Sequence, residues 1–208
     1  MKQLLRFIAF LAFLIVVAIA GTMLVLQGRG ISARPQPSAI EKRGALFMRS
    51  WMTPSTYKGL KSPVSPTEEN FVAGRDHFAD HCMPCHGNDG SGETEMGRNL
   101  YPKAPDMRLP RTQQLSDGEL FYIIENGVKL TGMPAWGTGT PEGEKASWQL
   151  VTFIRRMPAL TADDIEAMKP FNPTSRAQMD QEKQEQDFLN GGDPAPSPDP
   201  HAAHKHPQ

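Results

Sequence analysis

Cysteine is scarce in this 208-residue chain: Cys82 and Cys85 are the only two, and they lie three positions apart. A framework of disulfide bonds, which stabilises many small secreted domains, is therefore excluded. The sequence also lacks convincing strand-type alternation of apolar and polar residues. The sequence shows no distinctive spacing of paired carboxylates or of a nucleophile and a base. We therefore predict an all-α protein that is not an enzyme and has no small-molecule substrate.

Basic residues are unevenly distributed, although the formal net charge is only -1. Residues 1–66 contain nine Lys or Arg and one acidic residue, residues 67–160 contain nine and thirteen, and residues 161–208 contain four and nine. A nucleic-acid-binding protein would concentrate its basic residues on the folded domain. Because they precede the domain here, nucleic acid is excluded as a partner.

The one long apolar run lies near the N-terminus. Residues 7–26 carry no charge, and this length suits the hydrocarbon core of a lipid bilayer. A small-residue cleavage site is conceivable around Ala18 to Ala20, but the apolar run continues beyond it to Leu26. We predict that residues 1–28 are a transmembrane anchor rather than a cleaved signal, and that residues 7–26 contact the bilayer.

The next stretch, residues 29–66, is predicted to be a Pro-rich basic linker. Residues 27–66 have a net charge of +6 and little hydrophobic periodicity. This charge would favour anionic lipid head groups, although a merely solvated tether fits equally well. An apolar cluster from Phe47 to Met52 is compatible with a short helix packed on the domain or on the bilayer.

Helix signals begin after this linker. A capping box at Ser65–Glu68, a second at Ser116–Glu119 and a start at Thr140–Glu142 predict three main helices in a domain over residues 67–160. The pattern Thr161–Asp164 predicts a short helical extension over 161–171. Residues 172–208 are dominated by Gln, Glu, Asp, Ser and Pro, so we expect a disordered tail.

The chemistry is carried by the run Cys82-Met83-Pro84-Cys85-His86. Two thiols at this spacing can bond the two vinyl groups of one haem, while the adjacent histidine reaches the iron. A structural zinc site would need a second pair of ligands, and a dithiol redox motif would need strand–helix–strand surroundings. The predicted cofactor is therefore one covalently attached haem c, with zinc and dithiol chemistry as weaker alternatives.

The residues around this run resemble class I c-type cytochromes of bacterial respiratory chains, over about residues 67–160. The family pattern Gly-x-x-x-Phe-x-x-x-Cys-x-x-Cys-His-Gly corresponds here to Gly74, Phe78, Cys82, Cys85, His86 and Gly87. The resemblance implies a cytochrome c-like domain of three main helices around one haem. It also implies that the first and last helices cross closely, with Gly74 and Phe78 against Trp148 and Phe153.

The resemblance further implies the remaining haem residues. Met133, in the sequence Gly132-Met133-Pro134-Ala135-Trp136, resembles the loop that supplies the second iron ligand, so His86 and Met133 would be the two metal ligands. The Pro105 carbonyl, or that of Pro102, would accept a hydrogen bond from His86. Trp136 would line the haem edge or bind a propionate, although simple packing explains it equally well.

We accordingly expect electron transfer by a single-pass protein of the bacterial cytoplasmic membrane, with the haem domain on the periplasmic side, where this family receives its haem. Redox proteins at the membrane would be its partners. The alternatives are a cytochrome subunit of a dehydrogenase, reductase or oxidase complex, a haem-based sensor, and metal delivery by the His-rich end. That end contains His201, His204 and His206.

Overall fold

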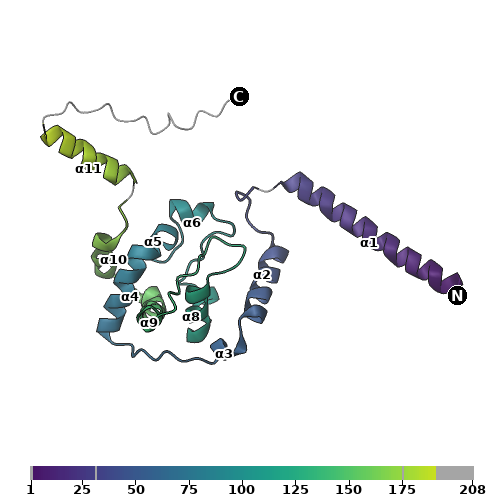
Figure 1. Ribbon diagram of the computed structural model, residues 1–208, viewed down its shortest axis with the longest axis horizontal. Helices are drawn as coiled ribbons and strands as arrows, with labels where there is room; N and C mark the ends of the chain where they lie inside the picture. The colour runs from purple at the N-terminus through teal and green to yellow at the C-terminus, as the bar shows by residue number, and fades with distance from the viewer. Residues whose placement is uncertain (1, 31, 175, 191–208) are drawn as a thin grey trace.

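The computed structural model describes residues 2–30, 32–174 and 176–190, and this part of the chain contains helices and no strands (Figure 1). The predicted all-α class is confirmed. The α-helices are α1 (Lys2–Arg29), α2 (Ala39–Met52), α3 (Ser55–Lys58), α4 (Glu68–His81), α5 (Met83–His86), α6 (Glu95–Asn99), α7 (Pro110–Gln113), α8 (Asp117–Asn126), α9 (Pro141–Arg156), α10 (Ala162–Met168) and α11 (Arg176–Leu189). Two 3-10 turns, η1 (Met157–Ala159) and η2 (Lys169–Phe171), follow α9 and α10.

The core is built where α4 crosses α9, the most extensive helix contact in the fold. A Cβ atom at Gly74 would collide with the Gln149 carbonyl oxygen, so only glycine permits this approach. The Phe153 ring then lies between those of Phe71 and Phe78, with ring centroids 5.6 and 5.0 Å away. Trp148 instead stacks on Phe121 of α8, with centroids 4.2 Å apart and planes 7° apart. Phe153 is therefore the aromatic that meets Gly74 and Phe78.

The predicted helix starts are correct with one exception. The capping box at Ser116 and Glu119 forms, and α9 begins with Thr140 as its cap. At α4, however, the N-cap is Thr67, whose hydroxyl accepts the Asn70 N–H, and not Ser65. The Ser65 carbonyl accepts the Thr67 N–H at 2.8 Å and the Asn70 amide at 3.0 Å, so Ser65 forms a turn before the helix.

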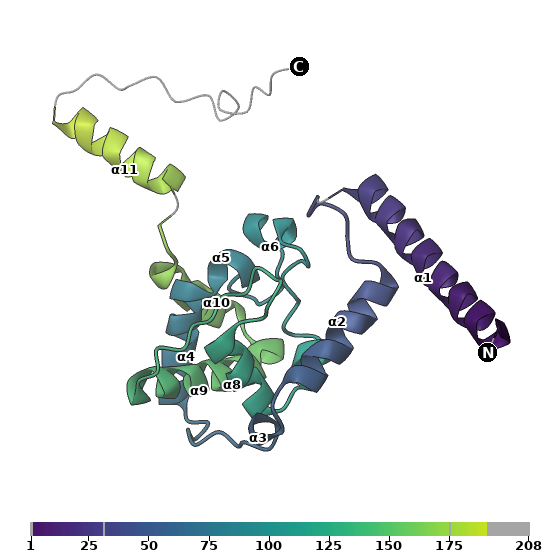
Figure 2. The same ribbon diagram turned by 45° about the vertical axis from the view of Figure 1, so that its right-hand side comes forward.

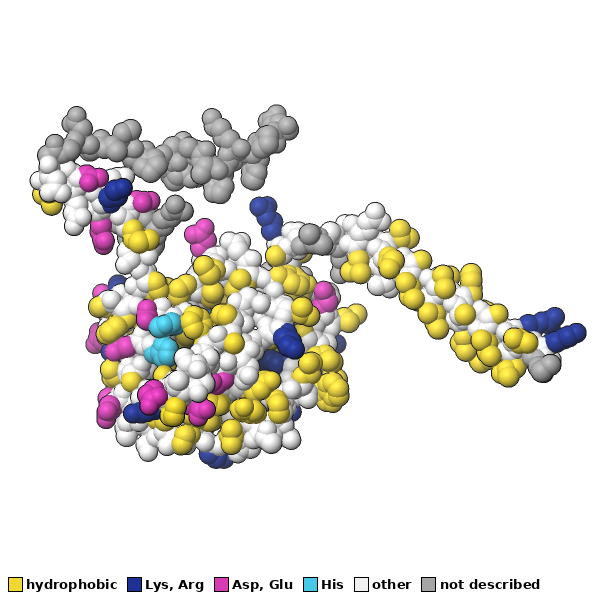
Figure 3. All heavy atoms as spheres, viewed as in Figure 1, with side chains coloured by type: hydrophobic (Ala, Val, Ile, Leu, Met, Phe, Trp, Pro, Cys, Tyr) yellow, Lys and Arg dark blue, Asp and Glu magenta, His cyan; other side chains and the backbone are white. Residues whose placement is uncertain are grey.

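Helix α1 is apolar on all sides and projects from the rest of the molecule (Figures 1 and 3). Within the described residues it is the one helix long and apolar enough to cross a membrane, with a mean hydropathy of 2.8 over its most apolar part. Its side chains from Lys2 to Gly28 are exposed. This is consistent with membrane anchoring, although a signal sequence has the same length and composition.

The segment predicted as a linker contains two helices, α2 and α3. Ser38 and Glu41 form a capping box at the start of α2, a local signal that stabilises a helix despite the flanking prolines. After it, Tyr57 packs on α8: its ring lies 4.9 Å from that of Tyr122 and 6.4 Å from that of Phe121. Residues 38–60 therefore differ from the unstructured tether that the prolines and charges suggest.

The C-terminal side also carries more structure than expected. Helix α10, capped by Thr161 and Asp164 as predicted, buries Met168 completely in the core beside α4. Helix α11 forms where a disordered tail is predicted, because its Gln, Glu, Lys and Met residues are good helix formers even without a packing partner. Figures 1 and 2 both show α11 standing apart from the other helices. The His-rich end lies outside the described residues.

Candidate functional site

The haem-attachment run forms a single helical turn at the end of α4. Cys82 ends α4 and begins α5, and its carbonyl accepts the N–H groups of Cys85 and His86 at 3.2 and 2.9 Å. Neither cysteine is paired in a disulfide bond. Before haem is attached, burial raises the pKa of the Cys82 thiol to about 12 and also raises the pKa of the Cys85 thiol. The turn brings both sulfur atoms and the His86 ring to one cavity.

His86 is buried, and its Nδ1 atom has no hydrogen-bond partner of good geometry among the described residues. Burial lowers the pKa of the imidazole, while the nearby Pro105 carbonyl opposes this shift. The ring is therefore neutral at physiological pH, the form in which histidine binds a metal. The Ala104–Pro105 backbone packs closely against Gly92, because a Cβ at Gly92 would lie only 2.5 Å from the Ala104 carbonyl oxygen.

Met133 comes from a different segment of the chain than His86, in an irregular loop after α8. The Met133 carbonyl accepts the Val128 N–H at 3.1 Å, and its N–H donates to the Thr131 hydroxyl at 3.1 Å. Gly127, with φ +65°, starts this loop, which ends where the Trp136 N–H donates to the Ile124 carbonyl at 3.0 Å. The loop is thus fixed to α8 at both ends.

All six predicted site residues, namely Cys82, Cys85, His86, Pro105, Met133 and Trp136, line this cavity. Most of its remaining wall is apolar, from Leu115, Leu120, Ile123, Ile124, Val128 and Ile154. A large flat macrocycle with an apolar face suits such walls, and two thiols with a neutral buried histidine suit covalent haem. Within the described ranges no group of three His, Cys, Asp or Glu side chains is placed to hold a bare metal ion.

A family comparison agrees with this chemistry. Residues 69–154 match the family model described as "Cytochrome C oxidase, cbb3-type, subunit III". This part of the chain is a c-type cytochrome. Its cofactor is covalently bound haem c, Cys82 and Cys85 occupy the two cysteine positions of the attachment motif, and its role is haem-based electron transfer.

The cytochrome was also compared with curated proteins and with solved structures. No curated protein matches it. Among solved structures it is similar to a chain of the "Kuenenia stuttgartiensis reducing HAO-like protein complex Kustc0457/Kustc0458", with 21% identity and a TM-score of 0.41. The match covers 48% of this chain and 47% of the other, so the cytochrome spans less than half of that chain's length.

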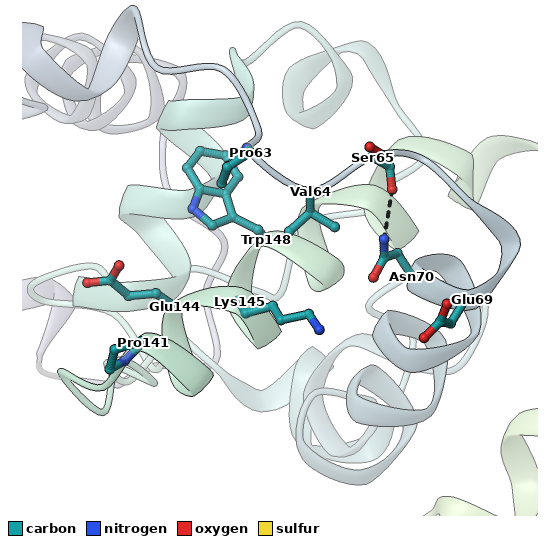
Figure 4. Close-up of a pocket in the computed structure, with 9 residues that line it drawn as sticks. All are labelled: Pro63, Val64, Ser65, Glu69, Asn70, Pro141, Glu144, Lys145 and Trp148. Carbon is teal, nitrogen blue, oxygen red and sulfur yellow. Dashed lines mark hydrogen bonds between the residues drawn. The ribbon is translucent and has the colours of Figure 1, made fainter.

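A second hollow of the cytochrome domain lies away from the haem motif, between α4 and α9 (Figure 4). Trp148, Val64 and Pro63 form its apolar side, and the charged side chains of Glu69, Glu144 and Lys145 lie at its rim. None of the residues predicted to contact haem lines it. It is the groove along which residues 63–65 approach the core, and we assign no chemistry to it.

The haem cavity of the cytochrome contains residues that the sequence analysis missed. Ala45, Leu46 and Arg49 of α2 line it, together with Lys103 and Arg111. The signal that could have revealed α2 is the capping box Ser38–Glu41, which precedes a helical spacing of Leu46 and Arg49. Nothing local indicates that this helix face would meet a cavity formed by residues more than thirty positions later.

Proposed function

We propose that this cytochrome is a membrane-tethered electron carrier of a respiratory chain, in which His86 and Met133 bind the haem iron. The observation that carries the proposal is that the two side chains, 47 positions apart, come from separate segments and line one cavity with both cysteines. The haem supplies the redox chemistry by accepting and releasing one electron at its iron.

The protein residues would determine how that cofactor behaves. His86 and Met133 together would leave no open iron position, which favours electron carriage over reaction with a substrate. The Pro105 carbonyl would orient the His86 ring through Nδ1, the buried atom that otherwise has no partner. The apolar walls would limit the access of water to the reaction centre, and thioether ligation by methionine would favour a fairly high reduction potential.

Helix α1 would hold the cytochrome at the bacterial cytoplasmic membrane, with the haem domain on the periplasmic side. Its length and apolar composition support a single span. Charge alone does not set the orientation, because Arg29, Arg34 and Lys42 follow the span while Lys2 and Arg6 precede it. The orientation rests on haem attachment, which takes place outside the cytoplasm in this family.

The second candidate is a cytochrome subunit of a larger oxidoreductase complex. The family model that matches residues 69–154 describes a subunit of cytochrome c oxidase, and this observation favours the alternative. Purification of the tagged chain in mild detergent distinguishes the two. A stoichiometric partner would support the subunit, and a haem protein that purifies alone and exchanges electrons with several partners would support the carrier.

The ligand pair is tested by Met133→Leu, with Met96→Leu as the matched control because Met96 is exposed and does not line the cavity. We expect Met133→Leu to abolish the methionine-to-ferric-iron absorption band, to lower the reduction potential and to let the reduced protein bind carbon monoxide. Met96→Leu should change none of these. Retention of the band in Met133→Leu would overturn the assignment, and carbon monoxide binding by the unaltered protein would favour a sensor.

A further inference from the structure

Helix α2 forms one wall of the haem cavity, although it precedes the family-matched residues 69–154. Its cavity face carries Ala45, Leu46 and Arg49, and the last two are half-buried. The other face carries Phe47 and Trp51, which are 67% and 70% exposed. The helix therefore turns Arg49 and Leu46 toward the cavity and its two aromatic residues outward.

Two guanidinium groups meet at this wall. Arg49 comes from α2 and Arg111 from α7, and they are close enough for Arg111 to lower the pKa of Arg49, although burial is the larger cause. Within the described residues, Arg49 has a repulsive electrostatic interaction with Arg111 and a weaker attractive one with Glu119. Glu119 is the anion nearest to Arg49 in this respect, but its effect on the pKa of Arg49 is the smallest of the three, and its Oε2 atom accepts the Ser116 N–H at 2.9 Å. Arg49 is half-buried and Arg111 is exposed, so Arg49 in particular gains from an anionic partner in the cavity.

Specific contacts hold α2 in this position. The Tyr101 hydroxyl donates to a Glu41 carboxylate oxygen at 3.0 Å, which joins the start of α2 to the loop beside the cavity. At the other end, the Lys58 ammonium donates to the Ser50 carbonyl at 2.5 Å, and buried Thr53 caps the helix through the Arg49 carbonyl. Arg49 is thus presented to the cavity by a helix that is joined at its start to the Tyr101 loop and at its end to α3, which packs on α8.

We propose that Arg49 and Arg111 bind the two propionate carboxylates of the haem, and that α2 caps this edge of the cofactor. This inference rests on the proposed haem site. A haem brings two carboxylates to the cavity that both guanidinium groups line, and the fork of arginine donors matches a carboxylate in a bidentate manner. The segment before the family domain would then complete its cofactor site.

The site has an electrostatic consequence for the cytochrome. A cation held near the iron stabilises the reduced state, which carries one positive charge fewer than the oxidised state. Arg49 is half-buried, so solvent screens its charge less than that of an exposed arginine. Arg43, on the same helix, is exposed and does not line the cavity. The two arginines form a matched pair for an experiment.

The test compares Arg49→Gln, Arg111→Gln and Arg43→Gln in the full-length haem-loaded protein. We expect the first two to lower the reduction potential clearly more than Arg43→Gln does. We also expect Arg49→Gln to speed tryptic cleavage after Lys42 and Arg43, because α2 would lose its hold on the haem edge. Arg111→Gln should speed cleavage less, because it leaves the Arg49 contact intact.

Equal potentials in Arg49→Gln and Arg43→Gln, with unchanged cleavage of α2, would overturn the inference. This failure is distinguishable from failure of the proposed function, because haem attachment and the Met133-dependent absorption band are recorded on the same samples. If the band is present while the arginine variants behave alike, only the propionate site is wrong. If Arg49→Lys, which keeps the positive charge, does not restore any of the potential lost in Arg49→Gln, the electrostatic part of the inference is wrong.

Discussion

Helices α2 and α11 each have 14 residues, and both lie outside the family-matched domain, on opposite sides of it. The sequence predicts a linker before the domain, in which Phe47 to Met52 could form a short helix, and a disordered tail after it. Helix α2 has a complete capping box and lines the haem cavity. Helix α11 has no buried residue among its described side chains. Helix formation alone therefore does not make a segment part of a domain. One face of the helix must also contact that domain.

The largest effect should come from Gly118→Ala, where α8 meets the segment after α2. A Cβ at Gly118 would collide with the Tyr57 carbonyl oxygen and approach the Leu60 Cβ to 2.9 Å. We expect the free energy of unfolding to fall by about 1–3 kcal/mol, as is typical of overpacking. Chemical denaturation of the haem-loaded protein measures this change.

Gly44→Ala is the matched control for that variant. A Cβ at Gly44 in α2 would meet nothing within 4 Å, so the higher helix propensity of alanine should leave stability unchanged or slightly raised. Equal stability of Gly118→Ala and Gly44→Ala would mean that residues 53–60 do not pack on the domain in solution. The contrast between α2 and α11 would then disappear.

Tyr57→Ala should have the next largest effect. The variant removes ring contacts with Phe121 and Tyr122, and such pairs contribute about 0.5–1.5 kcal/mol each beyond burial. We expect a loss of about 1–2 kcal/mol in the free energy of unfolding, together with faster proteolysis of α2. Tyr57→Phe, which keeps the ring, should show neither change. If Tyr57→Ala speeds proteolysis of α2 but leaves the free energy of unfolding unchanged, α3 positions α2 without stabilising the core.

On the C-terminal side, Thr161→Ala should cost about 1 kcal/mol of stability at neutral pH, as expected for the loss of a helix cap. The Thr161 N–H, and then its hydroxyl, lower the pKa of Asp164. The Asp164 contribution is therefore present above the unfolded pKa of about 3.9 and is lost as the pH falls through the lower folded value.

Thermal unfolding measured between neutral and acid pH tests the predicted direction of this pH dependence. The unaltered protein should lose stability over that acid range more steeply than Asp164→Asn, which no longer titrates at this position. Identical acid dependence in the two proteins would mean that the Asp164 carboxylate does not accept the Thr161 N–H and hydroxyl. In that case α10 would resemble α11 more than α2.

The smallest effect should come from a chain that ends at Thr174 and lacks α11 and the residues after it. We expect its thermal stability, haem absorption and reduction potential to equal those of the full chain, because no described side chain of α11 is buried or lines the cavity. A loss of function with an unchanged haem spectrum would instead point to metal delivery by the His-rich end.

The parts that the sequence predicts are those with local signals. The spacing of Cys82, Cys85 and His86, the caps at Ser116 and Thr140 and the all-α class each depend on neighbouring residues. Gly74 is also predictable, because glycine inside a helix needs a reason such as close packing. The role of Met133 in binding iron remains a prediction, although its loop lines the cavity.

The parts that the sequence does not predict depend on contacts between distant segments. Arg49 and Arg111 are 62 positions apart, and no periodicity relates them. The most apolar residues of α2, such as Phe47 and Trp51, point outward, so hydrophobicity indicates the wrong face. The face of α2 that lines the cavity can be recognised only when the other cavity walls, from α7, α8 and the Met133 loop, have been placed.

The docking of α2 also sets the reach of the cytochrome. If all of residues 29–66 were a flexible tether, the extended chain would span roughly 130 Å. Because α2 is fixed to the domain, only the nine residues between α1 and α2 remain, and they span at most about 30 Å. With α1 in a bilayer, the haem would search a thin layer above the membrane. This confinement raises its effective concentration for membrane partners and excludes distant ones.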